Sequence, residues 1–138
     1  PIVPAAPLLP AVGLLLDIGS GNGSPGLVLA TLRRDVPVVL LEPRQRRWAF
    51  LREAARTVGR PDVDIRRSRH DGYGGPPAQT VSLRALALPL DEIAPLLAVG
   101  GRVLAWGAPP DGSALFAAEP SPRPDLHVRR RVDVPRPT

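Results

Sequence analysis

Short apolar runs alternate along the chain with longer segments in which apolar residues recur at helical spacing. In residues 44–58, for example, Trp48, Leu51, Ala55 and Val58 fall on one helical face. The runs typical of β-strands are 13–18, 36–41, 63–65, 80–83 and 101–106. The segments typical of helices are 26–34, 44–58 and 91–98. Strands and helices are therefore expected to alternate along the chain.

Strands that alternate with helices form a mostly parallel sheet, because right-handed crossovers place the helices on both faces. The pattern therefore predicts an α/β, Rossmann-like fold. Binding sites in such sheets lie outside the carboxyl ends of the strands. Asp17, Glu42, Arg69 and Arg84 fall at the carboxyl ends of four predicted strands, so we expect them at one edge of the sheet.

Both ends of the chain are rich in proline and less regular. Residues 1–12 contain four prolines and predict an extended, Pro-rich lead without a helix. Residues 13–107 form the predicted core. In the Pro/Arg-rich segment 108–138, the pattern predicts a helical turn at 114–118 and a last strand at 127–134.

The composition argues against several kinds of site and location. The chain has no cysteine and only two histidines, so we expect neither a disulfide framework nor a metal site. Its longest apolar run, 11–16, is too short to cross a bilayer, and the leading residues lack the basic start of a signal peptide. The sequence therefore predicts a cytoplasmic protein without a membrane partner.

The basic residues are all arginine: 18 of them stand against 13 acidic residues, which gives a formal charge of +5. A GC-rich coding bias explains much of this excess, since alanine, glycine and proline are abundant as well. Arginine also binds phosphate through two parallel hydrogen bonds, so the charge is compatible with an RNA partner.

The strongest motif is Asp17 followed by a glycine-dense loop at 19–26. Glycine lacks the Cβ that would keep a ligand away from the backbone, so a large flat ligand on this loop explains the motif. Gly21, Gly23 and Gly26 also fit the dinucleotide pattern, which makes a nicotinamide cofactor an alternative. We favour it less, because Asp17 would repel a pyrophosphate but suits a ligand with a cationic end.

Glu42 ends the second predicted strand. A carboxylate at this position is suited to accept hydrogen bonds from both ribose hydroxyls of an adenosine. The alternative is a solvated acidic residue that merely ends a strand, and the nearby glycine loop makes it the weaker interpretation.

Four blocks of the sequence resemble the GidB (RsmG) family of ribosomal RNA methyltransferases. In the first, residues 17–27, Pro25 precedes the last glycine of the loop. The second, 41–51, has an acidic residue, a basic pair and then Phe-Leu, with arginine in place of the family's usual lysine. Residues 81–85 and 96–102 are similar to later blocks of the family.

The resemblance implies a class I S-adenosylmethionine-dependent methyltransferase fold, truncated at both ends, that methylates guanine N7 in small-subunit ribosomal RNA. The implied partner is that RNA or the small ribosomal subunit. Guanine N7 already carries a lone pair, so no strong base is required, and no catalytic residue is assigned. The implied cofactor-binding residues are Asp17, Gly19, Ser20, Gly21, Gly23, Pro25, Glu42, Pro43, Arg69, His70 and Arg84. The candidates for RNA contact are Arg44, Arg46, Arg47, Arg84 and Trp106.

Two alternatives stay open beside this interpretation. The substrate side departs from the family, since Trp106 and Gly107 stand where the family has Lys-Gly. The chain is then either a methyltransferase for another RNA or a small molecule, or a non-catalytic paralogue that binds the cofactor. The arginines at 44–47 also have a plain interpretation as a solvated helix face.

Overall fold

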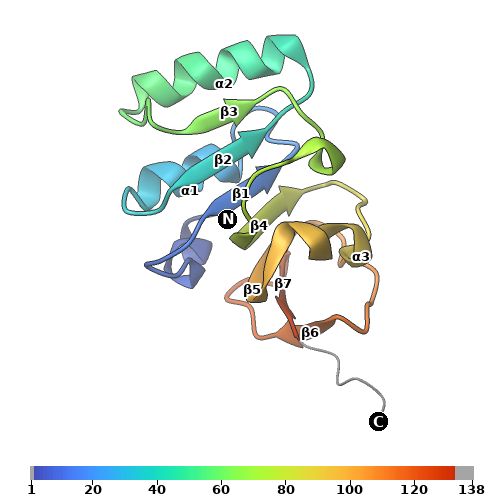
Figure 1. Cartoon of the computed structure of the whole chain (residues 1–138). Helices are drawn as coiled ribbons and strands as arrows, with labels where there is room; N and C mark the ends of the chain where they lie inside the picture. The colour runs from blue at the N-terminus through green and yellow to red at the C-terminus, as the bar shows by residue number, and fades with distance from the viewer. Residues whose placement is uncertain (1, 133–138) are drawn as a thin grey trace.

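A seven-stranded sheet organises residues 2–132, the part of the chain that the computed structural model describes (Figure 1). The strands are β1 (Leu15–Ile18), β2 (Val38–Leu41), β3 (Asp64–Arg66), β4 (Ala78–Arg84), β5 (Leu97–Trp106), β6 (Phe116–Glu119) and β7 (Leu126–Arg131). Their order in the sheet is β3-β2-β1-β4-β5-β7-β6. Strands β1 to β5 are parallel, and β7 runs antiparallel to both β5 and β6.

Helices cover both faces of this sheet, as the sequence predicts. The α-helices are α1 (Gly26–Leu32), α2 (Gln45–Thr57) and α3 (Leu90–Ile93), and the 3-10 helices are η1 (Val3–Leu8), η2 (His70–Gly72) and η3 (Ala94–Leu96). On one face, η1, α1 and α2 pack on strand residues such as Leu15 and Leu40. On the other, α3 and the loop before it pack on residues such as Leu16 and Leu41. The side chains of successive strand residues thus pack into the cores on opposite faces of the sheet.

The direction of the chain reverses beside β1. From β1 the chain proceeds to β2 and β3 on one side, and it then returns to place β4 on the other side of β1. The connections after β1 and after β4 therefore diverge, and the crevice between them is where open α/β sheets bind ligands. In this register Asp17 of β1 lies directly opposite Ser82 of β4.

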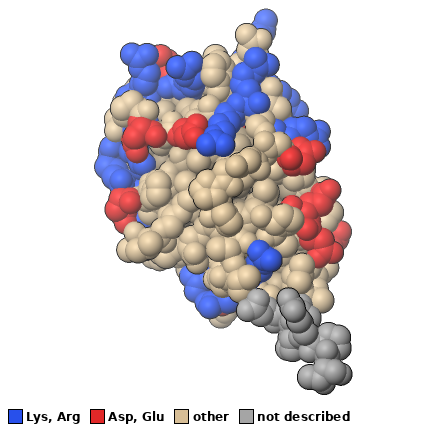
Figure 2. Space-filling view, in the orientation of Figure 1, with Lys and Arg blue, Asp and Glu red and all other residues tan. Residues whose placement is uncertain are grey.

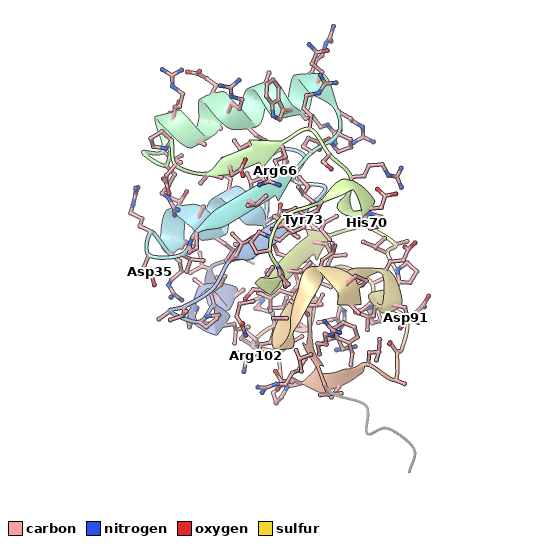
Figure 3. The ribbon with its side chains drawn as sticks, in the orientation of Figure 1. Asp35, Arg66, His70, Tyr73, Asp91 and Arg102 are labelled. Atoms are coloured by element: carbon pink, nitrogen blue, oxygen red, sulfur yellow. The ribbon has the colours of Figure 1, made fainter. Side chains whose placement is uncertain are left out.

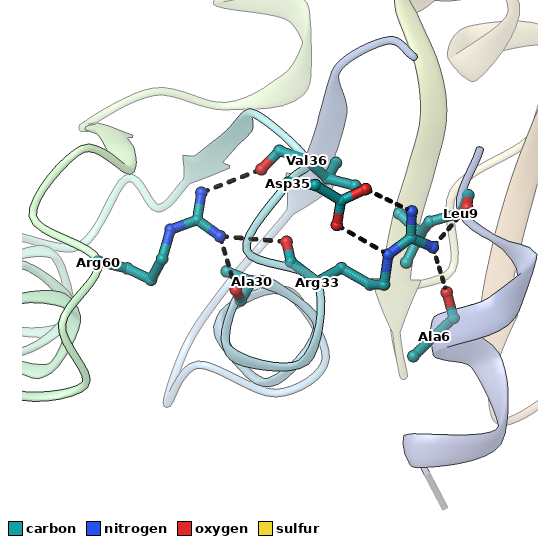
Figure 4. A network of polar contacts seen from close by, with 7 residues as sticks. All are labelled: Ala6, Leu9, Ala30, Arg33, Asp35, Val36 and Arg60. Carbon is teal, nitrogen blue, oxygen red and sulfur yellow. Dashed lines mark hydrogen bonds and ion pairs between the residues drawn. The ribbon is translucent and has the colours of Figure 1, made fainter. Parts of the chain in front are cut away.

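Two arginines tie the first helices to their neighbours through backbone carbonyls (Figure 4). The guanidinium of Arg60 is buried and donates to the carbonyl oxygens of Ala30, Arg33 and Val36 at 2.6, 3.2 and 3.0 Å. Arg33 donates in turn to the carbonyl oxygens of Ala6 and Leu9 at 2.9 and 2.6 Å. These bonds satisfy carbonyls at the end of α1 and fix η1 against it.

The prediction of an extended lead without a helix is wrong. Residues Val3–Leu8 form the 3-10 helix η1, in which a proline occupies the first turn, where its missing N–H costs no hydrogen bond. Ile2, Ala5 and Leu9 are buried in the core beside α1. Packing of these apolar side chains, together with the bonds from Arg33, orders the segment despite its prolines.

The C-terminal part also differs from expectation. The predicted helical turn at 114–118 is wrong: Phe116–Glu119 is strand β6, which pairs with β7. Its Glu119 accepts hydrogen bonds from Arg102 of β5 and Arg130 of β7 at 2.8 and 2.7 Å, contacts that single-sequence patterning does not reveal. The predicted last strand corresponds to β7, and Val134 lies outside the described residues.

The predicted helix 91–98 is shorter than expected and β5 is longer. The α-helical part ends at Ile93, a 3-10 turn containing Pro95 follows, and the strand already begins at Leu97. The fifth strand, expected to begin at Gly101, instead contains Gly100 and Gly101 in its interior, at an irregularity in its pairing with β4. A Cβ at Gly101 would lie 2.7 Å from the Gln79 carbonyl oxygen, so only glycine fits there.

Replacement of Arg60 is expected to destabilise the fold. Arg60→Met keeps the aliphatic stem but leaves buried carbonyls of α1 and the following turn without donors, so we expect the free energy of unfolding to fall by about 3 kcal/mol. Urea denaturation measures this change. Replacement of the exposed Arg56 by methionine is the matched control, and we expect it to change the free energy of unfolding by no more than about 0.5 kcal/mol. Equal stability of the two variants would show that the hydrogen bonds from Arg60 to the backbone carbonyls do not stabilise the fold.

Candidate functional site

Asp17 lies at the centre of the site region and is completely buried. Its Oδ1 accepts a hydrogen bond from the Ser82 hydroxyl at 2.5 Å, as the register of β1 and β4 requires. Its Oδ2 accepts no hydrogen bond of normal geometry. Burial raises the pKa of Asp17 to about 6, while the hydroxyls of Ser82 and Ser20 and the backbone of Gly26 favour the charged form. Asp17 does not line the cavities described below.

The glycine loop wraps around this carboxylate. A Cβ at Gly26 would lie 2.4 Å from Asp17 Oδ2, so glycine is needed where α1 begins. Gly19 and Gly21 have φ angles of +66° and +53°, a left-handed conformation that glycine adopts without strain. Their backbone atoms face the cavity at the end of β1, while Gly23 and Pro25 turn the chain into α1.

Glu42 holds the glycine loop to the start of α2. Its carboxylate is almost fully buried; Oε1 accepts the Gly21 N–H at 2.9 Å and Oε2 accepts the Arg44 N–H at 2.8 Å. Each carboxylate oxygen has a second lone pair, so the group retains acceptor capacity toward a ligand. Glu42 thus fixes the geometry of the loop and also faces the cavity above it.

Three adjoining hollows lie outside the carboxyl ends of β1, β2 and β4. The central cavity has a volume of about 870 Å³, and its wall includes Gly19, Glu42, Pro43, Arg44, Arg47, Arg69, His70 and Arg84. The loop cavity, about 650 Å³, is lined by Gly19, Ser20, Gly21, Asn22, Ser24, Arg46, Arg47, Phe50, Arg84 and Ala85. The apolar cavity, about 560 Å³, includes Leu83, Ala85, Leu86, Leu88, Pro89 and Trp106 in its wall. Most of the residues predicted for the cofactor and the RNA therefore meet here.

His70 and Arg69 border the central cavity on the β3–β4 connection, where Figure 3 labels His70 in the turn of η2. The His70 ring is largely buried, with 12% of its side chain exposed, and its Nε2 lies 3.9 Å from Glu92. The Arg69 side chain is 71% exposed and lies 3.6 Å from Asp71. Of the two, His70 is the more firmly placed wall residue.

The other predicted RNA contacts fall into two groups. Arg44, Arg46 and Arg47 are exposed at the start of α2, and in Figure 2 basic side chains gather over this end of the molecule. Arg84 extends from the end of β4 and donates to the Ser24 hydroxyl at 3.2 Å. Trp106 is only 4% exposed and belongs to the core on the α1 face, and it also contributes to the wall of the apolar cavity.

Several residues of the site escaped the sequence interpretation. Ser82 became visible only through its register with Asp17, and Phe50 through its exposure on α2. Ala85 lines all three cavities and is the one non-glycine residue with positive φ, +51°, within residues 2–132. Its backbone N–H donates to the Trp106 carbonyl at 3.1 Å, which holds this conformation.

No group of histidine, cysteine or acidic residues suited to a metal ion is found in residues 2–132. Over the same part of the chain, none of the helices is both long and apolar enough to span a membrane.

A family model and several known proteins match the sequence of this chain. The family GidB, described as rRNA small subunit methyltransferase G, matches residues 3–108. The ribosomal RNA small subunit methyltransferase G of Acidothermus cellulolyticus is 44% identical over 103 residues, which are 72% of this chain and 46% of that protein. The protein of the same name from Salinispora arenicola is 42% identical over 119 residues, 77% of this chain and 49% of its own. The chain thus spans about half the length of these relatives.

Solved structures with the same architecture include methyltransferases. An RNA methyltransferase from Salinibacter ruber, in complex with S-adenosyl-L-homocysteine, superposes with a TM-score of 0.72 at 20% identity, over 91% of this chain and 85% of that one. An rRNA methylase from Streptococcus thermophilus has a TM-score of 0.66 at 16% identity, over 93% and 92%. The predicted class I methyltransferase fold is thereby confirmed.

The buried Asp17 carboxyl is expected to make stability depend on pH. Between about pH 4 and pH 6 an unfolded aspartate is ionised while native Asp17 still holds its proton, so the folded state binds more protons and loses stability as the pH rises. Asp17→Asn removes this loss. Its free energy of unfolding relative to wild type should increase by about 2 kcal/mol from pH 4 to pH 7.

Urea denaturation of both proteins across this pH range tests the expectation. Exposed Asp111→Asn serves as control for the loss of one negative charge. Parallel stability profiles of wild type and Asp17→Asn would show that native Asp17 titrates like an unfolded aspartate.

Proposed function

The chain belongs to the GidB family, and from this premise we propose that it binds S-adenosylmethionine and methylates guanine N7 in small-subunit ribosomal RNA. The observation that carries the proposal is the glycine loop held by Glu42, which opens on the central cavity at the switch point between β1 and β4. Relatives that align over most of this chain are named as the ribosomal RNA enzyme.

The residues present fit the proposed cofactor. Gly19 and Gly21 present bare backbone to the hollows, in conformations that leave no Cβ in the way. Glu42 keeps free lone pairs for ribose hydroxyls, and His70 borders the same cavity from the β3 side, where an adenine would lie. We infer that Gly19, Glu42 and His70 hold the nucleoside, with Pro43 and Arg69 at its rim, while the Gly21 N–H secures the Glu42 carboxylate.

The acceptor base belongs in the neighbouring apolar cavity. This hollow shares Ala85 and Leu86 with the central cavity, and Pro89 and Trp106 also line it. A flat base would be desolvated there, close to the proposed cofactor position. Buried Trp106 thus serves as a wall of the pocket and not as an open stacking surface.

Catalysis by this chain would come from the positioning of the two ligands. When bound, S-adenosylmethionine supplies an activated methyl group, and guanine N7 needs no deprotonation before methylation. The protein therefore has to orient two ligands and exclude water, which requires no acid–base pair. Arg84 stands between the loop cavity and the central cavity and so lies close to both ligands.

Basic residues on the rim support RNA as the substrate. Arg44, Arg46 and Arg47 are exposed beside the cavities, and guanidinium groups bind phosphate oxygens bidentately. Such contacts give affinity without sequence preference. The choice of guanine would come from the acceptor pocket.

Removal of the Glu42 carboxylate should weaken cofactor binding strongly. Glu42→Ala loses the ribose acceptors and also frees Gly21 and Arg44, so we expect the Kd for S-adenosylmethionine to rise at least about tenfold in isothermal titration calorimetry. Glu53→Ala, which removes an exposed carboxylate from the middle of α2, is the matched control and should bind like wild type.

NADH is titrated in parallel and should not bind. Circular dichroism of Glu42→Ala separates a lost ligand contact from a collapsed loop. Tight binding of NADH by wild type, or of S-adenosylmethionine by Glu42→Ala, would contradict the proposed cofactor site.

Methyl transfer is tested with small-subunit ribosomal RNA that lacks the modification. With methyl-labelled cofactor, wild type should form N7-methylguanosine, detected by mass spectrometry of digested RNA, and Glu42→Ala should lose nearly all activity. Product in another RNA, or label in a small molecule only, would reassign the substrate. Cofactor binding without any methylated product would identify a non-catalytic paralogue.

A further inference from the structure

The loop cavity carries positive charge without any counter-charge. Three of its wall residues are arginines, Arg46 and Arg47 from α2 and Arg84 from β4, and no acidic residue lines it. Ion pairs elsewhere in residues 2–132 join arginines such as Arg33 and Arg60 to aspartates, yet none involves these three. Their charge is therefore available to an anion from outside the chain.

These guanidinium groups approach the cavity from two walls. Arg47 lies over the glycine loop, with Nη1 3.6 Å from the position that a Cβ of Gly21 would take. Arg84 reaches the loop from the opposite strand and donates to the Ser24 hydroxyl at 3.2 Å. Arg46 stands one residue before Arg47 on α2 and completes the set. Groups arranged around one hollow suit a phosphate better than a dispersed basic surface would.

Phe50 adds a feature that phosphate binding alone does not need. Its ring is 55% exposed in the wall of the same cavity, four residues after Arg46 and thus on the same face of α2. Proteins often bind unpaired nucleotides with an exposed aromatic ring beside cationic groups. The base stacks on the ring, and the phosphate binds the cationic groups.

We propose that the loop cavity binds a nucleotide flanking the methylated guanine in single-stranded RNA, with its base stacked on Phe50 and its phosphate held by Arg46, Arg47 and Arg84. This inference rests on the proposed function, and it assigns to the loop cavity a ligand different from the nucleoside in the central cavity. A strand crossing from one hollow to the other passes Ala85, which lines both the loop cavity and the apolar cavity.

The test compares two labelled probes by fluorescence anisotropy without cofactor: a short single-stranded oligoribonucleotide, and a ribose-phosphate oligomer of the same length without bases. Phe50→Ala should weaken binding of the oligoribonucleotide about fivefold or more and leave the base-free oligomer unchanged. Phe50→Trp should restore binding. Val99→Ala, at an exposed apolar site on β5, is the control.

The arginines are tested through salt dependence. Arg46→Ala should reduce the slope of log affinity against log salt by about 0.7 for both probes, the value for one phosphate contact in a single strand. Arg56→Ala removes the same charge from the far end of α2 and should not change the slope.

Three results would overturn the assignment: equal weakening of both probes by Phe50→Ala, no weakening at all, or equal slopes for Arg46→Ala and Arg56→Ala. Loss of S-adenosylmethionine binding in Arg46→Ala would also overturn it, by giving the cavity to the carboxylate end of the cofactor. RNA binding with the expected pattern in a wild type that binds no S-adenosylmethionine would instead refute the proposed function and leave this site standing.

Discussion

A carboxylate placed in the middle of a sheet constrains everything around it. Asp17 is completely buried, so the strand beside it must supply a hydroxyl and the helix above it must begin with a residue that has no side chain. Ser82 and Gly26 meet these demands, and in doing so they fix the register of β4 and the position of α1. The glycine loop between β1 and α1 is consequently held at both ends before any ligand contacts it.

Arginine performs two separate tasks in a chain without lysine. Arg60 and Arg33 turn their planar groups inward and each satisfy several carbonyls at once, which the compact ammonium of lysine does less well. The arginines at the start of α2 line the cavities beside the glycine loop and form no ion pair within residues 2–132. Net charge alone therefore overstates the basic surface, since part of it is used to join helices.

Local patterning was sufficient for the elements that carry the site. Strand ends marked by Asp17, Glu42 and Arg84 converge because parallel strands share a direction, and this follows from the order of elements alone. The C-terminal hairpin was not predictable in this way, since β6 depends on Glu119 meeting arginines from two other strands. Without knowledge of these partners, the residues of β6 are as compatible with a turn as with a strand.

Glu42 joins two parts of the molecule through a single side chain. One oxygen holds the glycine loop and the other holds the backbone at Arg44, from which α2 and its arginines begin. A ligand that forms hydrogen bonds with this carboxylate perturbs its bonds to Gly21 and to Arg44 together. Thermodynamic linkage makes such an effect reciprocal: occupancy of the arginine-bearing surface must alter affinity at the loop by the same factor. The final complex with two ligands would then be the same whichever ligand binds first, but each ligand would bind with a different affinity when the other is already present.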